Sequence, residues 1–72
     1  MVGAMAATNY EFRIRGRLSE PALERFDMLE SDLERVETVL HGPVRDQAEL
    51  RGILDRVQSL GLELLEVRRL PD

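Results

Sequence analysis

The stretch HGPVRDQAELRGILDRVQSLGLELLEVRRL, residues 41–70, carries the clearest secondary-structure signals in this chain of 72 residues. Asp46 is a typical helix N-cap, and Glu49 three residues later completes the arrangement of a capping box. Apolar side chains then recur at helical spacing: Leu50, Ile53, Leu54, Val57 and Leu60. Gly61 follows them, where a left-handed C-terminal residue is expected. The stretch therefore predicts a helix after Asp46 and a final strand over residues 62–70, in which either Leu64 or Leu65 faces the helices.

Upstream, residues 10–18 alternate between two kinds of side chain with a period of two. One set is Tyr10, Phe12, Ile14, Gly16 and Leu18, and the other is Glu11, Arg13, Arg15 and Arg17. This alternation predicts a strand with one buried face. Ser19 is placed to cap a helix that follows, and Pro21 is tolerated in its first turn. Leu23 and Phe26 lie three residues apart on one face, so a helix of about two turns is expected.

The segment between these two helices allows two interpretations. Apolar residues Leu29, Leu33, Val36 and Leu40 fit a helical stripe, so one long helix is an alternative. An internal repeat favours a hairpin instead, because IRGRL (residues 14–18) aligns with LHGPV (residues 40–44) and each precedes a capped helix. On that interpretation residues 29–34 and 38–44 are strands, joined by a turn near residues 35–37.

The predicted order of strand, helix and strand occurs twice in succession. Two such halves make the split β-α-β pattern of ferredoxin-like domains. The sequence thus predicts an α+β fold with a four-stranded antiparallel sheet, two helices on one face, and the first and third strands in the centre. A two-stranded sheet under a helical hairpin is the alternative. We expect one domain over residues 10–72 and a flexible N-terminal tail over residues 1–9, with Met1 or Met5 as the initiator.

Residues 38–69, TVLHGPVRDQAELRGILDRVQSLGLELLEVRR, also carry a family resemblance. They resemble a group of small uncharacterised actinobacterial proteins of ferredoxin-like type, in which Gly-Pro-hydrophobic-x-Asp-Gln-Ala opens the last helix and Leu-Gly-Leu closes it. The N-terminal half resembles the group only by pattern, and SDLERVE (residues 31–37) has no glycine where the turn is expected. The resemblance implies the same fold and no catalytic residues.

Composition excludes several classes of function. The chain has no cysteine, which excludes a disulfide scaffold, a thiolate zinc site and a cysteine nucleophile. Its 14 acidic residues exceed its 10 basic ones, giving a net charge of −4, which argues against a nucleic-acid partner. No segment approaches the ~20 apolar residues of a membrane span, so we expect a cytoplasmic protein without membrane contact.

The residue types that catalysis needs are present but poorly grouped. His41 is the only histidine, and no second histidine or cysteine is available to complete a transition-metal site with it. It is expected on the sheet face away from the helices, as a partner-facing imidazole or a pH-sensitive contact. The carboxylates at residues 30, 32, 34 and 37 are expected on a solvated face or edge. We therefore expect no enzyme, no metal and no cofactor.

The helix-free face of the sheet is the remaining candidate site. It is expected to display Arg13, Arg15, Arg17, Val39, His41, Glu66 and Arg68. RNA recognition would need aromatic side chains there, but Tyr10 and Phe12 alternate onto the buried side. The arginines either neutralise neighbouring glutamates or remain available to a partner. We expect a non-enzymatic interaction or regulatory module that self-associates through this face or its edge, with Arg13, Arg15, His41 and Arg68 as the partner-binding residues.

A small-molecule sensor is the alternative function. ACT domains share the expected topology and bind amino acids near strand-to-helix turns, which here are residues 17–20 and 44–47. Helix N-termini at these turns offer N–H groups to an anionic metabolite.

Overall fold

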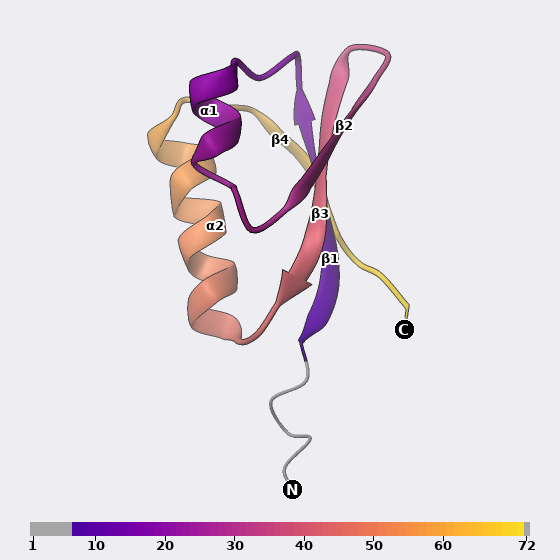
Figure 1. Cartoon of the computed structure of the whole chain (residues 1–72), viewed down its shortest axis with the longest axis vertical. Helices are drawn as coiled ribbons and strands as arrows, with labels where there is room; N and C mark the ends of the chain where they lie inside the picture. Colours follow the sequence, from indigo (N-terminus) through magenta and orange to yellow (C-terminus); the bar gives the residue numbers. More distant parts are fainter. Residues whose placement is uncertain (1–6, 72) are drawn as a thin grey trace, which may run out of the picture.

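The computed structural model describes residues 7–71. Its elements are β1 (Thr8–Arg15), α1 (Glu20–Glu24), β2 (Glu30–Glu34), β3 (Glu37–Val44), α2 (Gln47–Ser59) and β4 (Leu64–Arg69). The strands form one antiparallel sheet in the order β2-β3-β1-β4, and both helices lie on the same side of it (Figure 1). The predicted ferredoxin-like fold, with the first and third strands central, is confirmed. The two alternatives, a long helix over residues 29–40 and a two-stranded sheet, are wrong.

The hydrophobic core lies between the sheet and the two helices. Phe12, Ile14 and Leu40 from the central strands are completely buried. They are joined by Leu18, Phe26, Val44, Ile53 and Val57. Tyr10 packs against this cluster and stacks on Phe12, with ring centroids 6.2 Å apart. The alternation in β1 thus buries its apolar side chains and leaves its charged side chains on the opposite face, as predicted.

β1 occupies a slightly different range from the predicted strand. It begins at Thr8, two residues before the expected start of the domain, while residues 1–6 of the expected tail lie outside the described residues. It ends at Arg15, because Gly16 has a φ of +90° and turns the chain away from the sheet. Arg17 therefore lies in the connection to α1, and its predicted place on the strand beside Arg13 and Arg15 is wrong.

The connection after β1 is held by a buried hydroxyl group on β3. The side chain of Thr38 is 4% exposed, and its Oγ1 donates a hydrogen bond to the Gly16 carbonyl oxygen at 2.7 Å. Thr38 Oγ1 also accepts a hydrogen bond from the Leu18 N–H at 3.3 Å. Ser19 then caps α1 as predicted, since its Oγ accepts a hydrogen bond from the Ala22 N–H.

The predicted hairpin between β2 and β3 is confirmed. Glu34 pairs with Glu37, so only Arg35 and Val36 connect the two strands. Arg35 adopts the left-handed φ of +56° that would favour glycine, which explains how the turn forms in a segment without one. Further along β3, a Cβ atom on Gly42 would lie 3.3 Å from the Leu29 Cα and from the Met28 carbonyl oxygen, so glycine favours the close approach of the chain that follows α1.

The ends of α2 agree with its sequence signals, with one difference. Asp46 Oδ1 accepts a hydrogen bond from the Glu49 N–H at 2.8 Å, and Gly61 has a φ of +71°. The Glu49 carboxylate, however, accepts from the N–H of Arg45, one residue before the donor of a standard capping box. The N–H groups of Glu49 and Arg45 are therefore both capped by side chains, but the second of these bonds differs from that of a standard capping box.

β4 contains an irregularity that decides which leucine faces the helices. Arg13 pairs with Glu66 while the next residue, Ile14, pairs with Leu64, so Leu65 is an extra residue at a β-bulge. Leu64 packs against the core, whereas Leu65 is 37% exposed. Within residues 7–71, neither helix has the length and apolar character needed to cross a membrane.

Candidate functional site

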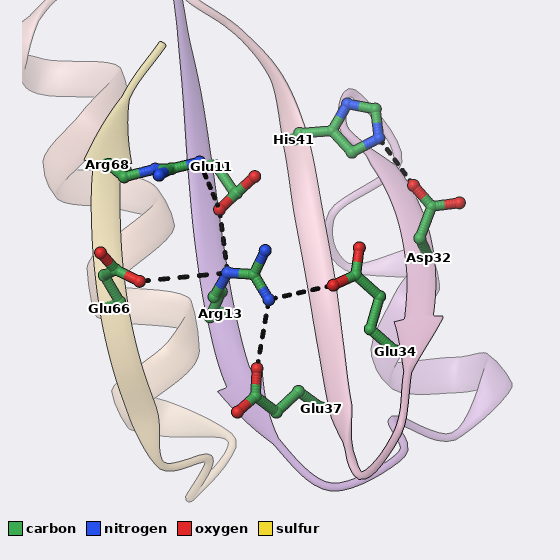
Figure 2. A network of polar contacts seen from close by, with 8 residues as sticks. All are labelled: Glu11, Arg13, Asp32, Glu34, Glu37, His41, Glu66 and Arg68. Atoms are coloured by element: carbon green, nitrogen blue, oxygen red, sulfur yellow. Dashed lines mark hydrogen bonds and ion pairs between the residues drawn. The ribbon is translucent and has the colours of Figure 1, made fainter.

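The side of the sheet that faces away from both helices is the candidate site, and we call it the open face. The strand register places thirteen residues on it: Glu30, Asp32 and Glu34 of β2, Glu37, Val39, His41 and Pro43 of β3, Asn9, Glu11, Arg13 and Arg15 of β1, and Glu66 and Arg68 of β4. Figure 2 shows eight of these side chains projecting from the four strands, with the helices behind the sheet.

Arg13 is the centre of the open face. Its Nε lies 3.0 Å from a carboxylate oxygen of Glu11 and 4.0 Å from one of Glu66. Its Nη1 lies 3.1 Å from Glu34 and 3.2 Å from Glu37 (Figure 2). These four carboxylates come from the four different strands, so one guanidinium group links the whole width of the sheet.

These hydrogen bonds keep Arg13 charged and restrict its access to a partner. The hydrogen bonds that Arg13 donates to Glu34, Glu37 and Glu11, in that order of effect, raise the pKa of Arg13 above its ordinary value. The Arg13 side chain is only 25% exposed, compared with 61% for Arg15. Val39, directly across from Arg13 in the register, is 3% exposed even though it lies on the open face. Long charged side chains therefore shield the centre of this face from solvent.

The other predicted partner-binding residues also have acidic neighbours within the chain. Arg15 Nε lies 2.9 Å from Glu63 Oε1, and Arg68 Nη2 lies 3.5 Å from Glu11 Oε2. His41 Nε2 lies 3.0 Å from Asp32 Oδ2. The structure thus brings Arg13, Arg15, His41 and Arg68 onto one face and pairs each with a carboxylate. The predicted neutralisation of arginines by glutamates is present, and the binding role of these residues stays a prediction.

Acidic side chains outnumber arginines on the open face, and the carboxylates at residues 30, 32, 34 and 37 lie on this face, as expected from the sequence. The acidic members are Glu11, Glu30, Asp32, Glu34, Glu37 and Glu66, against Arg13, Arg15 and Arg68. The signal was present in ESDLE, residues 30–34, where an acidic residue at every second position places three carboxylates on one face of β2. A face with this balance repels anions and suits a partner that presents cations or an alternating charge pattern.

The two outer strands of the sheet differ in character. All five residues of β2 are exposed, and three of them are acidic. β4 instead alternates charged Glu66 and Arg68 with Val67, which is 37% exposed. An edge strand offers unpaired backbone groups to another strand, and a row of like charges discourages such pairing. β4 therefore presents the more permissive edge.

The strand-to-helix turns proposed for a small ligand are lined by arginines but already capped. A hollow of about 340 Å³ at the turn into α2 is lined by Tyr10, Arg45 and Arg69, among others. The Glu49 N–H in this turn already donates to Asp46. Across residues 7–71, no group of three or more His, Asp or Glu side chains is arranged to hold a metal ion.

Together the fold and the open face define a small α+β domain of ferredoxin-like arrangement whose uncovered sheet side is rich in ion pairs. The chain belongs to a family described as a domain of unknown function (DUF8691), whose model matches residues 9–68. Comparisons with curated proteins and with solved structures found no significant match.

Proposed function

We propose that this domain is a non-enzymatic interaction or regulatory module that associates through the open face or an edge of its sheet, with a second copy of itself as its partner. The observation that carries the proposal is the strand order, which leaves one complete sheet face and two strand edges without a covering element among residues 7–71. Partner-binding roles for Arg15, His41 and Arg68 are part of this proposal. Arg13 contributes mainly by holding the neighbouring carboxylates in place.

Small size gives a physical reason for association. A 72-residue chain buries a modest fraction of its surface, so covering an additional sheet surface adds stability. Four large apolar side chains on β2, β4 and the hairpin turn also remain exposed in the single copy: Leu33, Val36, Leu65 and Val67. A symmetric dimer is the commonest way in which soluble proteins cover such surfaces. The cytoplasmic location and actinobacterial origin expected from the sequence stay predictions.

The first experiment measures the solution mass of the purified chain by light scattering on a sizing column, at several concentrations and at low and high salt. We expect a mass that approaches twice 8.3 kDa as concentration rises, and a weaker dimer at high salt because its contacts include exposed charges. A mass of 8.3 kDa at every concentration would contradict self-association. The open face would then be available to a different protein.

A pair of charge reversals then tests which side of the molecule associates. Arg68→Glu changes the open face, and Arg51→Glu makes the same charge change on α2, on the other side of the sheet. We expect Arg68→Glu to weaken the dimer and Arg51→Glu to leave it unchanged, since the helices lie away from the proposed interface. The opposite result, measured by the same light-scattering assay, would place the interface on the helices and overturn the proposal.

Ligand sensing is the second candidate, and the hollow beside Arg45 and Arg69 is the observation in its favour. An anion bound there would contact two guanidinium groups near the first turn of α2. A thermal-shift screen with amino acids and phosphorylated metabolites tests this candidate. Stabilisation that disappears in Arg69→Ala would support it, and no stabilisation across the panel would remove its basis.

A further inference from the structure

The outer edge of β4 is suited to pairing with a copy of itself. β4 pairs only with β1 in the sheet, and the Leu70 N–H just beyond it donates to the Asn9 carbonyl oxygen at 2.8 Å. In an antiparallel pair, successive residues direct their N–H and C=O groups alternately toward the partner strand and away from it. The backbone N–H and C=O groups of Glu66 and Arg68 therefore point toward β1. Those of Val67 and Arg69 point toward the outer edge.

The side chains of β4 are arranged differently on the two faces of the sheet. Glu66 and Arg68, with opposite charges, occupy the open face, where their side chains are 53% and 56% exposed. Val67 pairs with Phe12 in the register and so lies on the helix side, yet it remains 37% exposed because β4 is at the edge. The edge thus offers an exposed apolar residue between two opposite charges.

Symmetry and charge select one register for pairing two copies of β4. A two-fold axis centred on Glu66 would place Glu66 against itself, and an axis on Arg68 or Arg69 would place arginine against arginine. An axis on Val67 instead places Glu66 of each copy opposite Arg68 of the other, and brings the two exposed Val67 side chains together. The outward N–H and C=O groups of Val67 then form two reciprocal hydrogen bonds across the axis.

We propose that two copies of this chain pair antiparallel through β4, about a two-fold axis at Val67, and join their sheets into one. This inference rests on the proposed self-association and adds the edge and the register to it. The bulge at Leu65 and the proline at position 71 limit the paired segment to a few residues. The dimer should therefore be weak and concentration-dependent.

Site-specific cross-linking tests the register without changing any charge. The natural chain has no cysteine, so Val67→Cys introduces a single thiol at the proposed axis. Facing residues of a hydrogen-bonded pair lie about 5.5 Å apart between Cα atoms, within the range of a disulfide. We expect Val67→Cys to form a covalent dimer on mild oxidation, seen on a non-reducing gel. The matched control Leu33→Cys, an exposed position on β2, should stay monomeric.

Charge-reversal mixing tests the contact between Glu66 and Arg68 of different copies. Glu66→Arg alone and Arg68→Glu alone each place like charges across the axis twice, and should weaken the dimer about tenfold or more. An equimolar mixture of these two variants restores two opposite-charge pairs, so a heterodimer should form. Glu30→Arg on β2 is the control and should leave the dimer unchanged. Circular dichroism checks that each variant is folded, and the Val67→Cys result stands if a charge variant is not.

The outcomes separate this inference from the proposed function. A wild-type chain that is monomeric at all concentrations overturns both self-association and the β4 interface. A wild-type dimer that Val67→Cys does not cross-link, and that the variant mixture does not restore, overturns the β4 interface alone. In that case the dimer uses another surface. Cross-linking at position 67 but not at position 33, together with recovery on mixing, supports the proposed register.

Discussion

At the scale of single residues, buried hydrogen bonds and backbone conformation explain features that hydrophobicity does not. Thr38 lies among apolar core residues on the helix side of β3, yet its hydroxyl group serves two backbone groups of the loop after β1. A threonine in a buried strand position gives no such indication in the sequence, because its two partners are 20 and 22 residues away.

Replacing this hydroxyl should destabilise the fold. In Thr38→Val the shape is kept but the Leu18 N–H and the Gly16 C=O lose their partner, so the free energy of unfolding should fall by about 1–3 kcal/mol. Urea denaturation measures this change. The control Thr38→Ser keeps the hydroxyl and removes one methyl group, and should lose about 0.8 kcal/mol. A Thr38→Val protein as stable as wild type would show that the loop does not depend on this contact.

At the scale of secondary-structure elements, caps and turns account for most element boundaries. Asp46 and Gly61 correctly indicate where α2 starts and ends, and Ser19 correctly indicates the start of α1. The β2–β3 hairpin was harder to predict, because its turn places Arg35 at a positive φ where glycine is common. Its position followed instead from the internal repeat of strand and capped helix.

The hairpin turn provides a prediction at this scale. An L-residue at the φ of Arg35 loses about 1–2 kcal/mol relative to a right-handed conformation, and glycine does not. Glycine also increases the entropy of the unfolded chain, which offsets part of this gain. Arg35→Gly should therefore raise the free energy of unfolding by up to about 1 kcal/mol. Val36→Gly is the control and should lower stability, since Val36 does not have a positive φ. Equal effects of the two changes in thermal melting would contradict this explanation.

At the scale of the whole molecule, the ion pairs of Arg13 link all four strands. The carboxylates around it would repel one another without the guanidinium group. Because hydrogen bonding raises the pKa of Arg13, the stability from its charge is present below the ordinary arginine pKa and is lost only as the pH rises through the higher folded value. This contribution should be constant through the neutral and mildly alkaline range.

Removing the charge of Arg13 should make stability depend on salt. In Arg13→Leu the carboxylates on the open face keep their charge and lose their shared counter-ion, so Tm should fall most at low ionic strength and partly recover in concentrated salt. Arg15→Leu is the control, because its side chain is more exposed and pairs with Glu63. A Tm loss that is equal in the two variants, or independent of salt, would show that Arg13 does not act as a shared counter-ion.

The sequence alone predicts the order of elements, the fold class and the buried side of each central strand. These features depend on local signals, namely the period of apolar residues, the caps and the turn residues, which act within a few positions along the chain. It also placed Arg13, Arg15, His41 and Arg68 on a common face, since alternation alone assigns side chains to faces.

Which charged side chains come into contact depends on how the strands pair. The four carboxylates within 4.0 Å of Arg13 lie on four strands, brought together by strand register and by the bulge at Leu65. Register is a relation between distant segments, so alternation within each strand leaves it open. For the same reason, the contrast between the β2 and β4 edges appears only after the strands are paired.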